Sequence, residues 1–222
     1  MMNDVPLPAL TNHYNSHAER LADAWVHLAG VSIAIIGGGV LFALALWQGG
    51  FVQAGVLSIY AICLIAMLSL SAAYNLVRTM AAHNILRRLD HAAIFLMIAG
   101  SYTPFTVLRF DGVWALGMTI AVWTLALAGA FGKLFLPGLS KKIWVALYLV
   151  LGWLVLIALR PMIDTVPRAG LILLAIGGAI YTLGVVIYVW EKIPFRRAIW
   201  HGFVLAAAGV HYAAIVTGVV FA

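Results

Sequence analysis

The chain has 222 residues, of which 65% are hydrophobic and only 9% are charged, and its mean hydropathy is +1.07. Soluble domains carry about 25% charged residues, so this composition excludes a soluble globular protein. The formal net charge of +6 would also suit a nucleic-acid-binding protein, and the positions of the basic residues must decide between the alternatives.

Seven continuous apolar runs of about 20 residues, the length that crosses a bilayer as a helix, fill most of the chain. Strands of a membrane barrel would instead alternate apolar and polar residues. We therefore predict an all-α membrane protein, a seven-transmembrane helix bundle that forms one domain over residues 23–222 after an amino-terminal tail of residues 1–22. The predicted helices cover residues 23–47, 51–77, 90–108, 113–132, 143–159, 169–190 and 198–221.

Three breaks separate predicted helices most clearly. Gly49 and Gly50 form a short turn after the first helix, and a polar loop over residues 78–89 precedes the third. Pro161 ends the fifth helix, because proline cannot extend a helix without the loss of a hydrogen bond.

The basic residues gather on one side of the predicted bundle. The tail and the second, fourth and sixth loops hold ten Lys and Arg residues, whereas the opposite loops hold only three, Arg109, Arg160 and Arg168. By the positive-inside rule, the amino terminus is cytoplasmic and the carboxyl terminus lies outside. Topology and attraction to anionic headgroups explain the basic surplus, so we expect membrane lipids as partners, no nucleic acid, and a plasma-membrane location.

Polar side chains recur at the cytoplasmic ends of four predicted helices. They are Glu19, Asp23 and His27 on the first; Ser71 and Asn75 on the second; Asp90 and His91 on the third; and Arg197 and His201 on the last. Residues four apart share one face of a helix. Ionisable groups at membrane depth are costly and mark functional sites, so we predict that these groups line one polar chamber that binds a ligand. His211 lies about 15 Å further along the last helix by the helical rise.

Each of these residues also has a structural explanation. Asp90 could cap the third helix, Ser71 could donate a hydrogen bond between helices, and Arg197 could be one more positive-inside charge. If they act together, the chemistry is metal-assisted or acid–base hydrolysis, with Ser71, Asp90 and His201 as the candidate catalytic groups.

Four segments carry a resemblance to a known family: ERLADAWVH, SAAYN, LDHAAIFLMIAGSYTPF and AIWHGFVLAAAGVHYAAI. They resemble the bacterial hemolysin III proteins, a branch of the progestin and adipoQ receptor family that includes the adiponectin receptors. The resemblance covers nearly the whole chain. It implies seven helices with a cytoplasmic amino terminus, and a bacterial inner membrane location.

The resemblance also implies a zinc ion held by three histidines, one at the end of the second helix and two at the start of the last. In this sequence those positions are Asn75, Arg197 and His201. A guanidinium has no lone pair to donate, so only His201 remains as a family ligand, and we predict that no zinc cofactor is bound. Instead, Arg197 supplies the positive charge and pairs with Asp90. If zinc were bound, His27 or His91 would complete its shell.

Four functions remain open from the sequence. The first is a sensor of bilayer state or a lipid regulator without metal chemistry, and the second is a hydrolase of lipid amides or esters, which the resemblance implies. The third is a proton relay or transporter that uses the intramembrane His211. The fourth is the cytolytic activity that the family name suggests, for which the sequence offers no mechanism.

Overall fold

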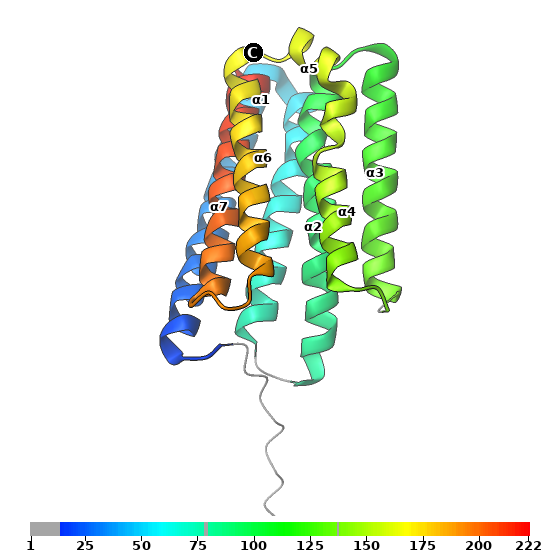
Figure 1. Cartoon of the computed structure of the whole chain (residues 1–222). Helices are drawn as coiled ribbons and strands as arrows, with labels where there is room; N and C mark the ends of the chain where they lie inside the picture. The colour runs from blue at the N-terminus through cyan, green and yellow to red at the C-terminus, as the bar shows by residue number, and fades with distance from the viewer. Residues whose placement is uncertain (1–13, 78–79, 137) are drawn as a thin grey trace, which may run out of the picture.

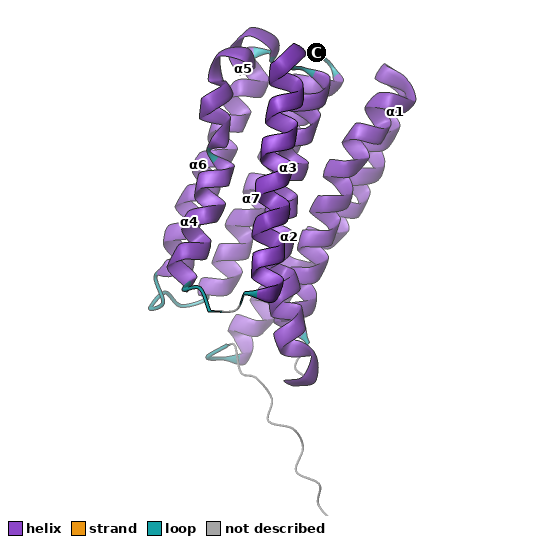
Figure 2. Ribbon diagram, turned by 90° about the vertical axis from the view of Figure 1, so that its right-hand side faces the viewer, coloured by secondary structure: helices purple, strands orange, loops and turns teal. Residues whose placement is uncertain are grey.

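The computed structural model describes residues 14–77, 80–136 and 138–222, and in these ranges every regular element is helical (Figure 2). The elements are α1 (His17–Leu76), α2 (Met80–Leu108), α3 (Gly112–Phe135), α4 (Lys141–Gly152), the 3₁₀ helix η1 (Leu154–Ala158), α5 (Leu159–Thr165), α6 (Arg168–Val189), α7 (Arg196–Ile215) and the π-helix η2 (Val216–Val220). Six helical segments are long and apolar enough to cross a membrane. The protein is therefore a helical membrane bundle.

Helix α1 is interrupted at Gly50, where the predicted turn lies. Gly50 has φ 67° and ψ −161°, a conformation that residues with a Cβ rarely adopt. In Figure 1 the blue first half of α1 rises from the end of the bundle where the described chain begins, and the cyan second half runs back toward that end. The break thus converts one 60-residue helical segment into an antiparallel pair.

Two predicted boundaries are wrong. The segment predicted as a polar loop is mostly helix, because α2 begins at Met80 and carries Arg87 and Arg88, residues with good helix propensity. The predicted stop at Pro161 does not occur either, since the chain continues through η1 and α5 to Thr165. Pro161 lies in the first turn of α5, where a helix needs no backbone N–H from it.

Helix α2 is the centre of the bundle. In its most apolar window 56% of the residues are buried, against 17 to 39% in the other five segments. It packs between α1 and α3 and also contacts α4 and α7. Large apolar side chains on other helices point outward, among them Trp47, Phe51 and Val113, as expected where lipid surrounds the protein.

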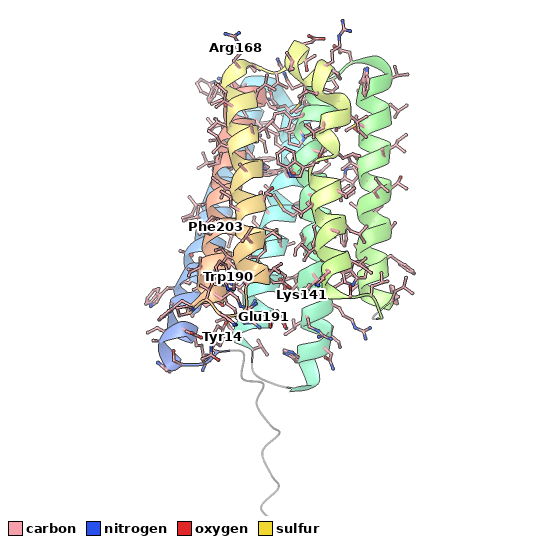
Figure 3. The ribbon with its side chains drawn as sticks, viewed as in Figure 1. Tyr14, Lys141, Arg168, Trp190, Glu191 and Phe203 are labelled. Carbon is pink, nitrogen blue, oxygen red and sulfur yellow. The ribbon has the colours of Figure 1, made fainter. Side chains whose placement is uncertain are left out.

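The two ends of the bundle differ in composition. The start of α1 and the carboxyl terminus lie at opposite ends (Figure 1). Tyr14, Lys141 and Glu191 lie at the end where α1 begins, and Arg168 lies at the other end (Figure 3). We call the end with Tyr14 and Lys141 the basic end, because it also holds the starts of α2 and α7 with their arginines.

Replacement of Gly129 in α3 tests the packing against α2. A Cβ at this position would lie 2.5 Å from Cε1 of Phe95, which is 2% exposed and is held between Trp144 and Tyr148. Because Phe95 has no room to move, Gly129→Ala should destabilise the protein by about 1–3 kcal/mol. Gly117→Ala is the matched control on the same helix, since nothing lies within 4 Å of its Cβ. Thermal unfolding in detergent measures both, and equal midpoints would contradict the packing described.

Candidate functional site

The start of α1 is fixed by local hydrogen bonds. The Ser16 hydroxyl accepts from the backbone N–H of Glu19 at 3.1 Å and caps the helix. The Glu19 carboxylate accepts from the N–H of Asn15 at 3.0 Å and from the N–H of Phe195, just before α7, at 3.2 Å. Glu19 therefore joins the starts of α1 and α7. The hydrogen bonds described for Glu19 do not include the cluster of side chains that lies one turn further along α1.

Asp23 is the centre of that cluster. Its side chain is fully buried and accepts hydrogen bonds from the Tyr14 hydroxyl at 2.6 Å and from His201 Nδ1 at 2.6 Å. His27 Nε2 lies 3.4 Å from Asp23 Oδ2, the oxygen that also accepts from Tyr14, whereas His201 Nδ1 contacts Oδ1. Burial, reinforced by contact with the Asp23 carboxylate, raises the pKa of Tyr14 above its usual value, so the phenol remains a donor. One carboxylate thus connects the segment before α1, α1 itself and α7.

The two histidines of this cluster face each other. The ring centroids of His27 and His201 are 4.3 Å apart. One donor atom each from Asp23, His27 and His201 lies within 4.8 Å of the other two. His27 Nε2 is buried and has no hydrogen-bond partner among the described residues. Neutral imidazoles with one carboxylate are a ligand set typical of zinc.

Asn75 and Arg197 form a second group beside the first. Arg197 donates to the Asn75 side-chain oxygen at 2.9 Å, and the Asn75 amide donates to the backbone oxygen of Ser71 at 2.9 Å. The Arg197 guanidinium lies 5.9 Å from the centre of the Tyr14 ring. The positions that the resemblance assigns to zinc ligands are thus together in space, but the set of Asn75, Arg197 and His201 does not fit a metal, because a guanidinium donates into it.

Asp90 lies inside α2, ten residues after its first residue, so the alternative explanation that Asp90 caps this helix does not hold. The Ser71 side chain and the positive charge of Arg197 both act on the Asp90 carboxylate and favour its ionised form. His91 Nδ1 lies 2.7 Å from the backbone oxygen of Arg87 and 3.4 Å from Asp90. Direct pairing of Arg197 with Asp90 stays a prediction, and the structure shows Arg197 donating to the Asn75 side-chain oxygen.

His211 is separate from these groups. It lies ten residues beyond His201 on α7, against the ring of Tyr181 at 5.4 Å between centroids. Its Nε2 atom is buried without a hydrogen-bond partner in the described part of the chain. The structure therefore brings together the predicted residues at the ends of four helical segments and leaves His211 deeper in the bundle.

A cavity of about 700 Å³ connects the two depths. Its lining includes His27, Ser71, Asn75, Asp90, His91, Arg197, His201 and His211, whereas Glu19 and Asp23 are not part of it. Among the described residues, Asp90 is the one acidic residue of the lining. Six basic residues line the same cavity: Arg87, Arg88, Lys133, Lys141, Arg196 and Arg197. The rest of the lining is largely apolar. The cavity is therefore amphipathic along its length.

Comparison with known proteins gives the family. Residues 14–212 match the family described as Haemolysin-III related. The chain belongs to this family. It is 34% identical over 197 residues to the "Hemolysin-3 homolog" of Bacillus subtilis (strain 168), which covers 87% of this chain and 91% of the relative. It is 30% identical to "Hemolysin-3" of Bacillus cereus, over 87% of this chain and 89% of that one.

A mammalian protein is similar over almost the same length. The human "Monocyte to macrophage differentiation factor" is 33% identical over 207 residues, 89% of this chain and 83% of that protein. The predicted relationship to the hemolysin III and progestin and adipoQ receptor proteins is confirmed.

Tyr14 is the functional-site residue that sequence reasoning missed. It lies in the predicted tail, three residues before the start of α1, and its sequence neighbours are polar. Nothing in that pattern signals that its hydroxyl reaches both the Asp23 carboxylate and, at 3.4 Å, the backbone oxygen of Asn75.

Removal of the Asp23 carboxylate tests its role as the common acceptor. Asp23→Ala removes the carboxylate that accepts hydrogen bonds at 2.6 Å from the Tyr14 hydroxyl and from His201 Nδ1. Each unsatisfied buried group costs about 1–3 kcal/mol, so the thermal unfolding midpoint in detergent should fall clearly. Asp164→Ala is the control, because Asp164 is exposed and lies 4.0 Å from Arg160. A midpoint as high as that of the control would show that the cluster does not hold α1 to α7.

Proposed function

We propose that this protein binds a single-chain anionic amphiphile in the cavity between its helices and so acts as a sensor or regulator of membrane lipid state. The observation that carries the proposal is the cavity itself. Its volume of about 700 Å³ lies within the range of about 300–1,000 Å³ typical of small-molecule sites. Membrane lipids are the partner class that fits such a site, and nucleic acid is not part of the proposal.

The charges of the lining support an anionic headgroup. Six basic residues against one acid give the cavity a positive end, and arginine binds carboxylates and phosphates with two parallel hydrogen bonds. The acyl chain would extend past apolar side chains such as Ile98, Leu174 and Val204, which line the same cavity. A neutral or cationic lipid would leave this positive charge uncompensated.

A second candidate function is hydrolysis of a lipid amide or ester, and one contact favours it. Asp23 accepts from His201 Nδ1, which leaves Nε2 of this cavity-lining residue as a free acceptor for a proton from water. Ser71 beside Asp90 would complete a polar wall near the headgroup. Release of a free fatty acid from a bound amide or ester substrate separates this candidate from binding alone.

The proposed topology has seven crossings, with a cytoplasmic amino terminus, in the plasma membrane, which for a bacterial cell is the inner membrane. The break at Gly50 supports the count, because it turns α1 into two antiparallel halves. The opposite ends of the bundle taken by the start of α1 and the carboxyl terminus support an odd number of crossings. The basic end then faces the cytoplasm by the positive-inside rule.

Blocking of the cavity tests the lipid proposal. A Cβ at Gly178 would lie 3.7 Å from the Trp153 ring, at ordinary contact distance, and Gly178 lines the cavity. Gly178→Leu should therefore fold but fill space that the acyl chain needs, and lower affinity for a fluorescent C16 fatty acid at least tenfold. Gly117→Leu adds the same side chain on the outer face of α3 and should bind as the unchanged protein does.

The same preparations separate the remaining outcomes. Equal affinity of the two variants, both folded, would overturn the lipid proposal. Free fatty acid produced from an added N-acyl amide would establish the hydrolase instead. Leakage of dye from liposomes measures the cytolytic activity that the family name suggests, which has no support in the contacts described.

Single-cysteine labelling tests the topology. The chain has one cysteine, Cys63, so Cys63→Ala gives a cysteine-free background. Asn15→Cys at the basic end should react with a membrane-impermeant maleimide only after the cells are opened, and Asp164→Cys at the other end should react in intact cells. Both native residues are exposed. The reverse pattern would contradict the orientation, and labelling of both positions from one side would contradict the odd number of crossings.

A further inference from the structure

Asp23, His27 and His201 form a donor set different from the one that the family resemblance implies. It keeps His201 and replaces Asn75 and Arg197 with two side chains from α1. We propose that these three residues bind one divalent transition metal ion of the zinc class. The inference concerns the wall of the cavity and does not depend on the proposed lipid ligand.

The first support is the chemistry of the set. Two imidazoles and one carboxylate are the three protein ligands typical of an open zinc site, and a fourth position remains for water or substrate. One donor atom of each residue lies within 4.8 Å of the others, so the set requires no rearrangement of helices. His27 and His201 also line the cavity, which gives an ion a path to the site.

The second support is independent of the first. His27 is only 4% exposed, and its Nε2 atom has no hydrogen-bond partner among the described residues, although it lies 3.4 Å from Asp23 Oδ2. A buried nitrogen without a partner is costly, and such groups are rare in folded proteins. A bound metal ion would take up its lone pair. The orphaned atom is thus directed at the carboxylate with which it would share the ion.

The distances show what must change on binding. Ligand atoms about 2.0–2.2 Å from a tetrahedral zinc ion are roughly 3.3–3.5 Å apart, which matches the separation of 3.4 Å between His27 Nε2 and Asp23 Oδ2. The separation of 2.6 Å between His201 Nδ1 and Asp23 Oδ1 is that of a hydrogen bond. Metal binding therefore releases the Nδ1 proton of His201 to solvent and moves these two atoms apart by less than 1 Å.

Neighbouring residues complete the surroundings. The Tyr14 hydroxyl donates to Asp23 Oδ2 and would orient the carboxylate as an outer hydrogen-bond partner. The nearby positive charge of Arg197, whose guanidinium donates to Asn75, opposes the binding of a metal cation. Asp23 and Asp90 supply the negative charge that offsets both. The site should consequently bind metal more weakly than a set of three histidines without an arginine beside it.

Metal binding by the full chain in detergent, without added lipid, tests this proposal. Equilibrium dialysis against Zn²⁺ should give one ion per chain, and Co²⁺ in its place should give the intense visible absorption of a tetrahedral complex. His27→Gln and Asp23→Asn keep a polar group of similar size, and each should lower the affinity at least tenfold. His17→Gln removes an exposed histidine from the same helix and should leave both readouts unchanged.

Further variants locate the ion. Asn75→Ala should retain the stoichiometric ion, and Arg197→Ala should bind it at least as tightly as the unchanged chain. The proposal is overturned if the unchanged chain binds less than one ion, or if His27→Gln, shown to be folded by its thermal transition, binds as tightly as the His17 variant. It is also overturned if Asn75→Ala abolishes binding while His27→Gln does not.

Discussion

The basic end of this bundle depends on one buried carboxylate. Asp23 has no access to solvent, and a buried charge without partners is strongly destabilising. Its hydrogen-bond partners come from the segment before α1 and from α7, 178 residues further along the chain. Asp23 can therefore be buried only when the start of the first helix packs against the start of the last. Glu19 reinforces the same junction from the exposed side, through the backbone of Phe195.

Much of this arrangement could be predicted from the sequence, because membrane helices have long apolar runs and polar residues four apart share a face. The break at Gly50 and the convergence of Asp23, Asn75 and His201 followed from those patterns. The start of α2 and the helix beyond Pro161 did not, because helices extend past the bilayer and proline is tolerated in a first turn. Tyr14 was not predictable either, since its partners Asp23 and Asn75 come near it only when the bundle folds.

The pairing of Asn75 with Arg197 changes the character of the site. These two side chains take positions that the family resemblance assigns to neutral metal ligands, and they form a hydrogen bond of 2.9 Å there. The fixed positive charge cannot be removed by a chelator or by a change of pH in the physiological range. The anion-attracting property of this wall is consequently permanent, whatever the nearby histidines bind.

The basic residues can serve two roles because both roles require the same placement. A cluster of Lys and Arg at one end of a helical bundle directs insertion into the membrane, and the same cluster around a cavity attracts an anionic headgroup. The two carboxylates near this cluster have different surroundings. Asp23 lies outside the cavity lining and accepts hydrogen bonds from Tyr14 and His201, whereas Asp90 lines the cavity under the charge of Arg197. A ligand in the cavity is therefore less able to disturb the hydrogen bonds of Asp23 than those of Asp90.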